Sequence, residues 1–108
     1  MTNLDIDRRL ALAIGYRPEH VSTIFDCIKV WQRGEWSTFD HQHANTIYRI
    51  AEHFKMMPAW NSAFAIWQVY RILQSNNNTT EVIDVHHTDP RTCIALAAIE
   101  AADRGVLK

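Results

Sequence analysis

The stretch Pro58-Ala-Trp-Asn-Ser-Ala-Phe-Ala-Ile-Trp-Gln-Val-Tyr-Arg-Ile-Leu73 has the most influence on the predicted fold. Read at helical spacing, it places five side chains on one face: Ala63, Ile66, Trp67, Tyr70 and Leu73. Further apolar side chains, at Phe64, Val69 and Ile72, occupy much of the remaining circumference. A helix that is apolar nearly all round is buried, and this one is too short and too polar in places to span a bilayer. We therefore expect a central helix around which the other segments pack.

Four more helices are predicted around this stretch. They run from Leu4 to Ile14, from Pro18 to Trp31, from Ala44 to Met57 and from Pro90 to Arg104. Three of them are followed by glycine, which often ends a helix in the left-handed conformation: Gly15, Gly34 and Gly105. The fourth ends or bends at Pro58, because proline disfavours helical geometry in the residue before it.

One segment, Glu81 to His87, is predicted as a strand because it contains three β-branched residues. A lone strand leaves backbone groups unpaired, and residues 36–41 are the only plausible partner for it within the chain. Residues 35–43 combine strand propensity with side chains that cap helices well, so this segment could be either a strand or the cap of the following helix. The predicted fold is mainly α, a compact bundle of about five helices with at most one small two-stranded β element.

Length and composition indicate one globular domain, residues 1–108. The chain is 47% hydrophobic and 21% charged, close to the averages for folded domains. Its formal net charge is −1 and its basic residues are scattered, which argues against a nucleic-acid partner. Four tryptophans in so short a chain favour a protein partner or self-association, because indole rings are over-represented in interface hot spots.

The cysteines and the amino terminus indicate a cytoplasmic protein. Cys27 and Cys93 are far apart and form no CxxC motif, so we expect two reduced thiols in the core or at its edge. The first nine residues carry charges where a signal peptide needs an apolar run. We expect no membrane association.

Two terminal segments carry a resemblance to a known family. Asp5-Ile-Asp-Arg-Arg-Leu-Ala-Leu-Ala-Ile-Gly-Tyr16 and Asp89-Pro-Arg-Thr-Cys-Ile-Ala-Leu-Ala-Ala-Ile-Glu-Ala102 are similar to the ends of small phage and prophage proteins of the "phage ABA sandwich" type. Tyr16 stands where those proteins usually have Trp, and the two predicted helices between residues 18 and 57 are extra. The resemblance implies a small sheet between helices, a phage origin and hence the cytoplasm of a host cell. It implies no functional residues.

A cluster of histidines and one aspartate suggests a metal site. His41 and His43 are two residues apart, as are Asp84 and His86, so on extended backbones each pair shares a face. If the two predicted strands pair, these four side chains offer ligands for zinc or another divalent transition metal. The preferred interpretation is that they are helix caps and exposed strand ends that hold no cofactor, and the metal site is the alternative.

The preferred binding surface consists of Trp31, Arg33 and Trp36, at the end of a predicted helix and in the following loop. No catalytic motif occurs, so the predicted function is that of a non-enzymatic phage-type accessory protein. Such a protein binds and modulates a host or defence-system component, as an inhibitor or by sequestering a ligand. The alternative is a metal-dependent hydrolase or nuclease that uses His41, His43, Asp84 and His86.

Overall fold

The computed structural model describes residues 1–74 and 77–107. Its elements are α1 (Asn3–Ala13), the 3-10 turn η1 (Pro18–His20), β1 (Val21–Ile24), β2 (Cys27–Gln32), β3 (Glu35–Thr38), α2 (Ala44–Phe54), β4 (Ala59–Asn61), β5 (Ile66–Gln74), β6 (Thr80–His87) and α3 (Pro90–Asp103). The strands form two three-stranded antiparallel sheets, β1-β2-β3 and β4-β5-β6. The fold is therefore α+β, and the prediction of a mainly α bundle of five helices is wrong.

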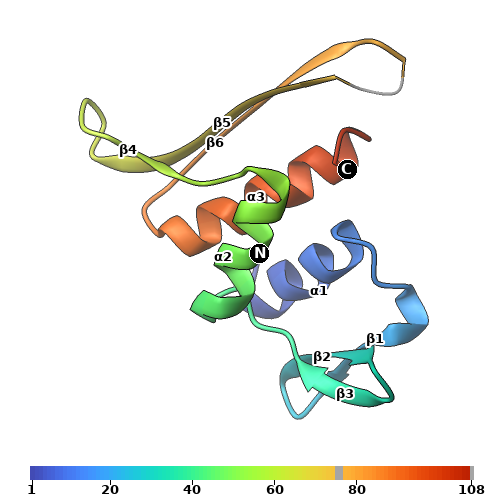
Figure 1. Ribbon diagram of the computed structural model, residues 1–108. Helices are drawn as coiled ribbons and strands as arrows, with labels where there is room; N and C mark the ends of the chain where they lie inside the picture. Colours follow the sequence, from blue (N-terminus) through green and yellow to red (C-terminus); the bar gives the residue numbers. More distant parts are fainter. Residues whose placement is uncertain (75–76, 108) are drawn as a thin grey trace.

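The helices lie between the two sheets (Figure 1). α3 packs against β5 and β6 on one side and against α1 and α2 on the other, while α1 also contacts β1 and β2. This layer order differs from the sheet between helices that the resemblance implied. The buried core is continuous through these layers, and α3 contributes more of it than any other helix. No helix within the described residues is long and apolar enough to cross a membrane.

Residues 58–73 form two strands rather than the predicted central helix. On β5, Val69 is fully buried, whereas its neighbours Tyr70 and Ile72 are 55% and 59% exposed. Apolar residues at nearly every position are compatible with both the helical and the strand period, so the pattern alone does not distinguish them. The strand conformation of β5 is stabilised by its pairing with β6 from Trp67 to Gln74, all but its first residue. The side chain of Asn61 accepts hydrogen bonds from the backbone of the turn between β4 and β5.

Residues 18–31 were predicted as a helix, and that prediction is also wrong, because β1, β2 and β3 form two tight hairpins. Phe25 and Asp26 join β1 to β2 with φ angles of 51° and 58°, and Arg33 and Gly34 join β2 to β3 with 52° and 81°. Two-residue loops with positive φ at both positions match the right-handed twist of the strands they connect. Gly34 therefore serves a hairpin turn instead of ending a helix.

The predicted strand at residues 81–87 exists as β6, but its predicted partner is wrong. β6 pairs with β5, as in Val69 opposite Val85. Residues 35–38 form β3, which pairs with β2 in the other sheet. Residue 39 onward leaves the sheet and leads into α2. The two strands that were expected to meet thus belong to different sheets.

The first and last helices agree with their predicted positions. Thr2 and Asp5 form a capping box at the start of α1, and Asp89 caps α3 through the backbone amides of Arg91 and Thr92. α3 has the nearly all-round burial that was expected of residues 58–73. The small alanine side chains of α3 allow β5 and β6 to pack closely on one side and α1 and α2 on the other. Cys93 on this helix is buried, whereas Cys27 is exposed, contrary to the expectation for that thiol.

Candidate ligand-binding cleft

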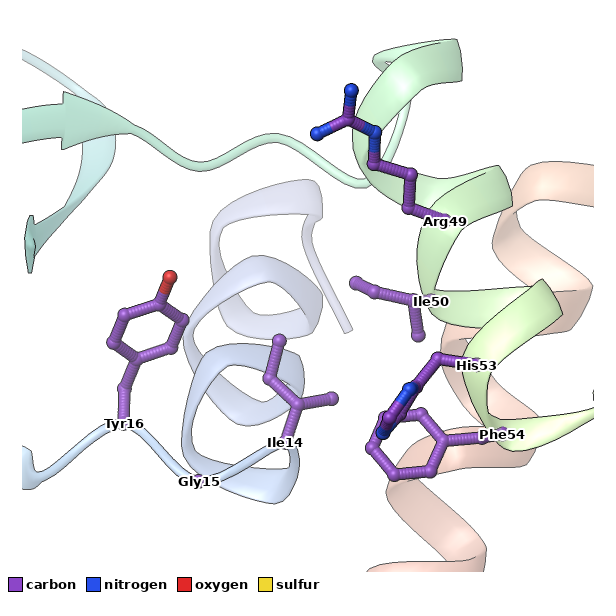
Figure 2. Close-up of a pocket in the computed structure, with 7 residues that line it drawn as sticks. All are labelled: Ile14, Gly15, Tyr16, Arg49, Ile50, His53 and Phe54. Carbon is purple, nitrogen blue, oxygen red and sulfur yellow. The ribbon is translucent and has the colours of Figure 1, made fainter.

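A pocket of about 410 Å³ opens between the end of α1 and the C-terminal half of α2 (Figure 2). Ile14, Ile50 and Phe54 give it an apolar floor. Its polar groups come from Tyr16 on one side and from Arg49 and His53 on the other, with Arg49 at the rim. We call this pocket the α1–α2 cleft. An apolar floor with a few polar groups at its edge is the usual construction of a small-molecule site.

Tyr16 is placed by the way α1 ends. Gly15 has a φ of 114°, and the backbone amide of Tyr16 then donates to the carbonyl of Ala11 at 3.1 Å. The phenol hydroxyl donates to Oε1 of Gln32 on β2 at 2.9 Å, and the ring packs edge-on against Phe39 with centroids 6.0 Å apart. The aromatic wall of the cleft is therefore held by the first sheet as well as by the helix end.

The opposite wall comes from the amphipathic pattern of α2. Ile50 and Phe54 lie four residues apart and face the core, and Arg49 and His53, each one residue earlier, lie beside them. Within the described residues Arg49 forms no ion pair. Its guanidinium is therefore available to a ligand.

A second hollow of about 360 Å³ adjoins the cleft and shares Ile14, Tyr16, Arg49 and Ile50 with it. Its other lining residues come from β2, from the end of β3 and the residue after it, and from the start of α2, and four of the six are polar: Val30, Gln32, Thr38, Phe39, Asn45 and Thr46. None of the described residues that line either hollow is acidic. The combined space suits a molecule with an apolar part, several hydrogen-bonding groups and a negative charge.

A buried polar network holds the loop that precedes α2. His41 is fully buried, and its backbone N–H and ring Nδ1 lie 2.7 Å and 2.6 Å from Oδ1 of Asp7 on α1. Ring Nε2 lies 3.1 Å from Nε2 of Gln42 and 3.3 Å from Oγ1 of Thr92 on α3. The amide of Gln42 is a donor, so the ring proton is assigned to Nδ1, which donates to Asp7.

Asp89 completes this network at the start of α3. Burial alone would raise the pKa of its carboxyl, but hydrogen bonds from Thr92, from Gln42 and from the amide of Arg91 hold that pKa below its ordinary value. Arg91 also donates to the backbone carbonyl of Gln42. The chemistry of the network is that of a satisfied structural junction between α1, the loop and α3.

The four residues predicted as metal ligands do not meet. His41 is enclosed in the network, and the exposed His43 is the residue before α2. Asp84 and His86 share a face of β6, as predicted, with Oδ1 and Nε2 3.0 Å apart. They lie in the β4-β5-β6 sheet, whereas His41 and His43 lie in the segment that leads into α2. The only group of possible ligands within 4.8 Å of one another in the described residues is Asp7, Asp40 and His41. There His41 bonds directly to Asp7 and leaves no gap for an ion between them.

The residues of the predicted binding surface do lie together. Trp31 and Trp36 are paired across β2 and β3, with ring centroids 5.5 Å apart in an edge-to-face arrangement, and Arg33 lies in the turn beside them. The two indoles are 38% and 41% exposed. The surface is thus formed by a hairpin instead of by a helix end and a loop.

Sequence reasoning missed the α1–α2 cleft. Tyr16 was noted only as a departure from the resembled family, and Arg49 and His53 were not predicted to form a site. One signal was present, since Arg49 and His53 repeat at four residues beside the apolar pair on an amphipathic helix. That spacing cannot show which segment faces the helix.

No protein-family model, curated protein or solved structure matches this chain.

Proposed function

We propose that this protein binds a small organic anion with an apolar ring or chain in the α1–α2 cleft. One observation carries the proposal: Arg49 lies at the rim of an apolar pocket and forms no ion pair among the described residues. None of the described residues that line this pocket is acidic. An arginine offers five N–H donors to a carboxylate or phosphate, and the floor removes the apolar part of the ligand from water. This is the ligand-sequestering form of the accessory function expected from the sequence.

Binding in this cleft needs no catalysis. The buried network places a carboxylate, an imidazole and a hydroxyl in a row, at Asp7, His41 and Thr92, as a hydrolytic triad does. However, His41 is fully buried and Thr92 is nearly so. A substrate cannot reach a hydroxyl that is enclosed and already donates to Asp89. The polar groups of the α1–α2 cleft, in contrast, line an open pocket.

The first experiment is native mass spectrometry of the purified protein, which detects a ligand carried over from expression. Thermal unfolding is then measured with aromatic carboxylates and nucleoside monophosphates, each beside its neutral amide or nucleoside. A ligand at about 100 times its dissociation constant adds about 2.7 kcal/mol to the free energy of unfolding. Anions should raise the melting temperature and their neutral counterparts should not.

The matched variants are Arg49→Met and Arg9→Met. Both remove one exposed positive charge from a helix, but Arg9 lies outside the cleft. Arg49→Met should weaken binding of the anion about tenfold or more, since a hydrogen bond to a charged group contributes about 1.5–3 kcal/mol. Equal binding by both variants, or no carried-over ligand and no stabilising anion, would refute the proposal.

The exposed pair of Trp31 and Trp36 favours a second candidate function, the binding of a protein partner through the β2–β3 hairpin. Paired, half-exposed indoles supply the large rigid contact area that interface hot spots use. Trp36→Ser should then reduce self-association measured by sedimentation velocity, or capture of a partner, with Trp60→Ser on the other sheet as the control. An unchanged association state and unchanged capture would remove this candidate.

A further inference from the structure

A separate pocket of about 350 Å³ lies between the C-terminal end of α2, the inner face of β5 and the segment after α3. Its floor includes Phe54, Met56 and Leu73, and its polar lining includes His53, Lys55 and Arg71. We call it the Arg71 pocket. It shares His53 and Phe54 with the α1–α2 cleft but has its own basic groups. None of the described residues that line it is acidic.

Arg71 is the unusual residue of this pocket. It follows Val69 by two positions on β5, so the strand alternation turns it toward the interior. Its Nε is buried and has no hydrogen-bond partner among the described residues. Glu81, on the same face of the neighbouring strand, forms its ion pair with Arg104 instead. A guanidinium that is partly desolvated and left unpaired is costly, because such groups in native proteins nearly always have partners.

We propose that the Arg71 pocket binds a second ligand, a carboxylate with a short apolar tail, whose head is held by Arg71. The planar guanidinium matches a carboxylate in a two-point hydrogen bond through its terminal nitrogens, which, unlike Nε, are not among the buried unpaired atoms. Lys55, at the left-handed end of α2, adds a second positive charge, and the apolar floor receives the tail.

This site is independent of the one proposed above. Its anchor lies on β5 in the second sheet, whereas Arg49 lies on α2 at the rim of the α1–α2 cleft. Only His53 and Phe54 are common to both pockets, and neither is the anchor of its site. Failure of one proposal therefore leaves the other open to its own test.

The experiment titrates octanoate into the full-length protein and follows binding by calorimetry. Octanol, with the same tail and no charge, and acetate, with the same head and no tail, are the comparison ligands. Octanoate should bind at least about tenfold more tightly than either, since both the charged contact and the apolar burial are needed. In methyl NMR spectra octanoate should shift the Met56 methyl signal and leave Met57, which does not line the pocket, unchanged.

Arg71→Met should weaken the octanoate binding that the Met56 methyl signal reports about tenfold or more, whereas Arg9→Met, outside both pockets, should leave it unchanged. Arg71→Met should also raise the melting temperature of the ligand-free protein, because it removes the unpaired donor. A purely structural role for Arg71 predicts the opposite shift. If Arg71→Met does not fold, the proposal is tested by the shifts of the Met56 and Met57 methyl signals when octanoate is added to the wild-type protein. Absence of a Met56 shift, or octanoate binding no tighter than octanol binding, would overturn the proposal.

Discussion

Replacement of Asp7 by alanine tests the buried network that holds the loop before α2. Oδ1 of Asp7 accepts two hydrogen bonds from His41, at 2.7 Å from the backbone amide and 2.6 Å from the ring, and His41 is fully buried. The alanine variant leaves both donors without a partner, and each buried unsatisfied donor costs about 1–3 kcal/mol. We expect the free energy of unfolding to fall by about 3 kcal/mol, a large part of the roughly 5–15 kcal/mol that stabilises a typical domain.

The assay is urea unfolding followed by tryptophan fluorescence and far-ultraviolet circular dichroism. With an m-value of about 1.5 kcal/mol/M, the urea midpoint should fall by about 2 M. The control is Asp5→Ala, two residues earlier on α1, where the lost side chain is an exposed cap contributing about 1 kcal/mol. A loss below about 1 kcal/mol in Asp7→Ala, or a loss equal to that of Asp5→Ala, would show that the network does not support the fold.

Three more predictions concern single residues. Because hydrogen bonds hold the pKa of Asp89 below its ordinary value of 3.8, its stabilising contribution is complete above that value and is lost as the pH falls through the folded-state pKa. Asp89→Asn should therefore flatten the dependence of stability on pH below about pH 4, and an unchanged slope would contradict this. Burial raises the pKa of the Cys93 thiol, so a thiol reagent should label the exposed Cys27 in the native protein and Cys93 only after unfolding. Phe25 has a φ of 51° and is 94% exposed, so Phe25→Asn should stabilise the protein by about 1 kcal/mol in thermal unfolding; destabilisation would mean that the ring makes a contact of its own.

The ends of the fold could be predicted from the sequence because their signals are local. A capping box at Thr2 and Asp5 and the pair Asp89-Pro90 mark helix starts within a few residues. The β-branched residues of β6 likewise indicate a strand without reference to the rest of the chain. These short-range preferences agree with the final structure, so no tertiary contact had to override them.

The middle of the chain was decided by tertiary structure. Residues 58–73 are apolar on both faces, which fits the helical and the strand period equally, and pairing with β6 selects the strand. The same holds at residues 18–31, where two turns with positive φ angles compete with a helical pattern.

The candidate sites depend on tertiary structure in the same way. Asp7 meets His41 across 34 residues of sequence, and Tyr16, in the segment after α1, lines one cleft together with Arg49 on α2. Arg71 faces the interior only because β5 is a strand. What the sequence by itself determined is where α1, α3 and β6 begin and end, since caps and propensities act over a few residues. Which strands pair, and hence which side chains share a pocket, depends on the free energy of contacts between distant segments, and only the folded chain sets it.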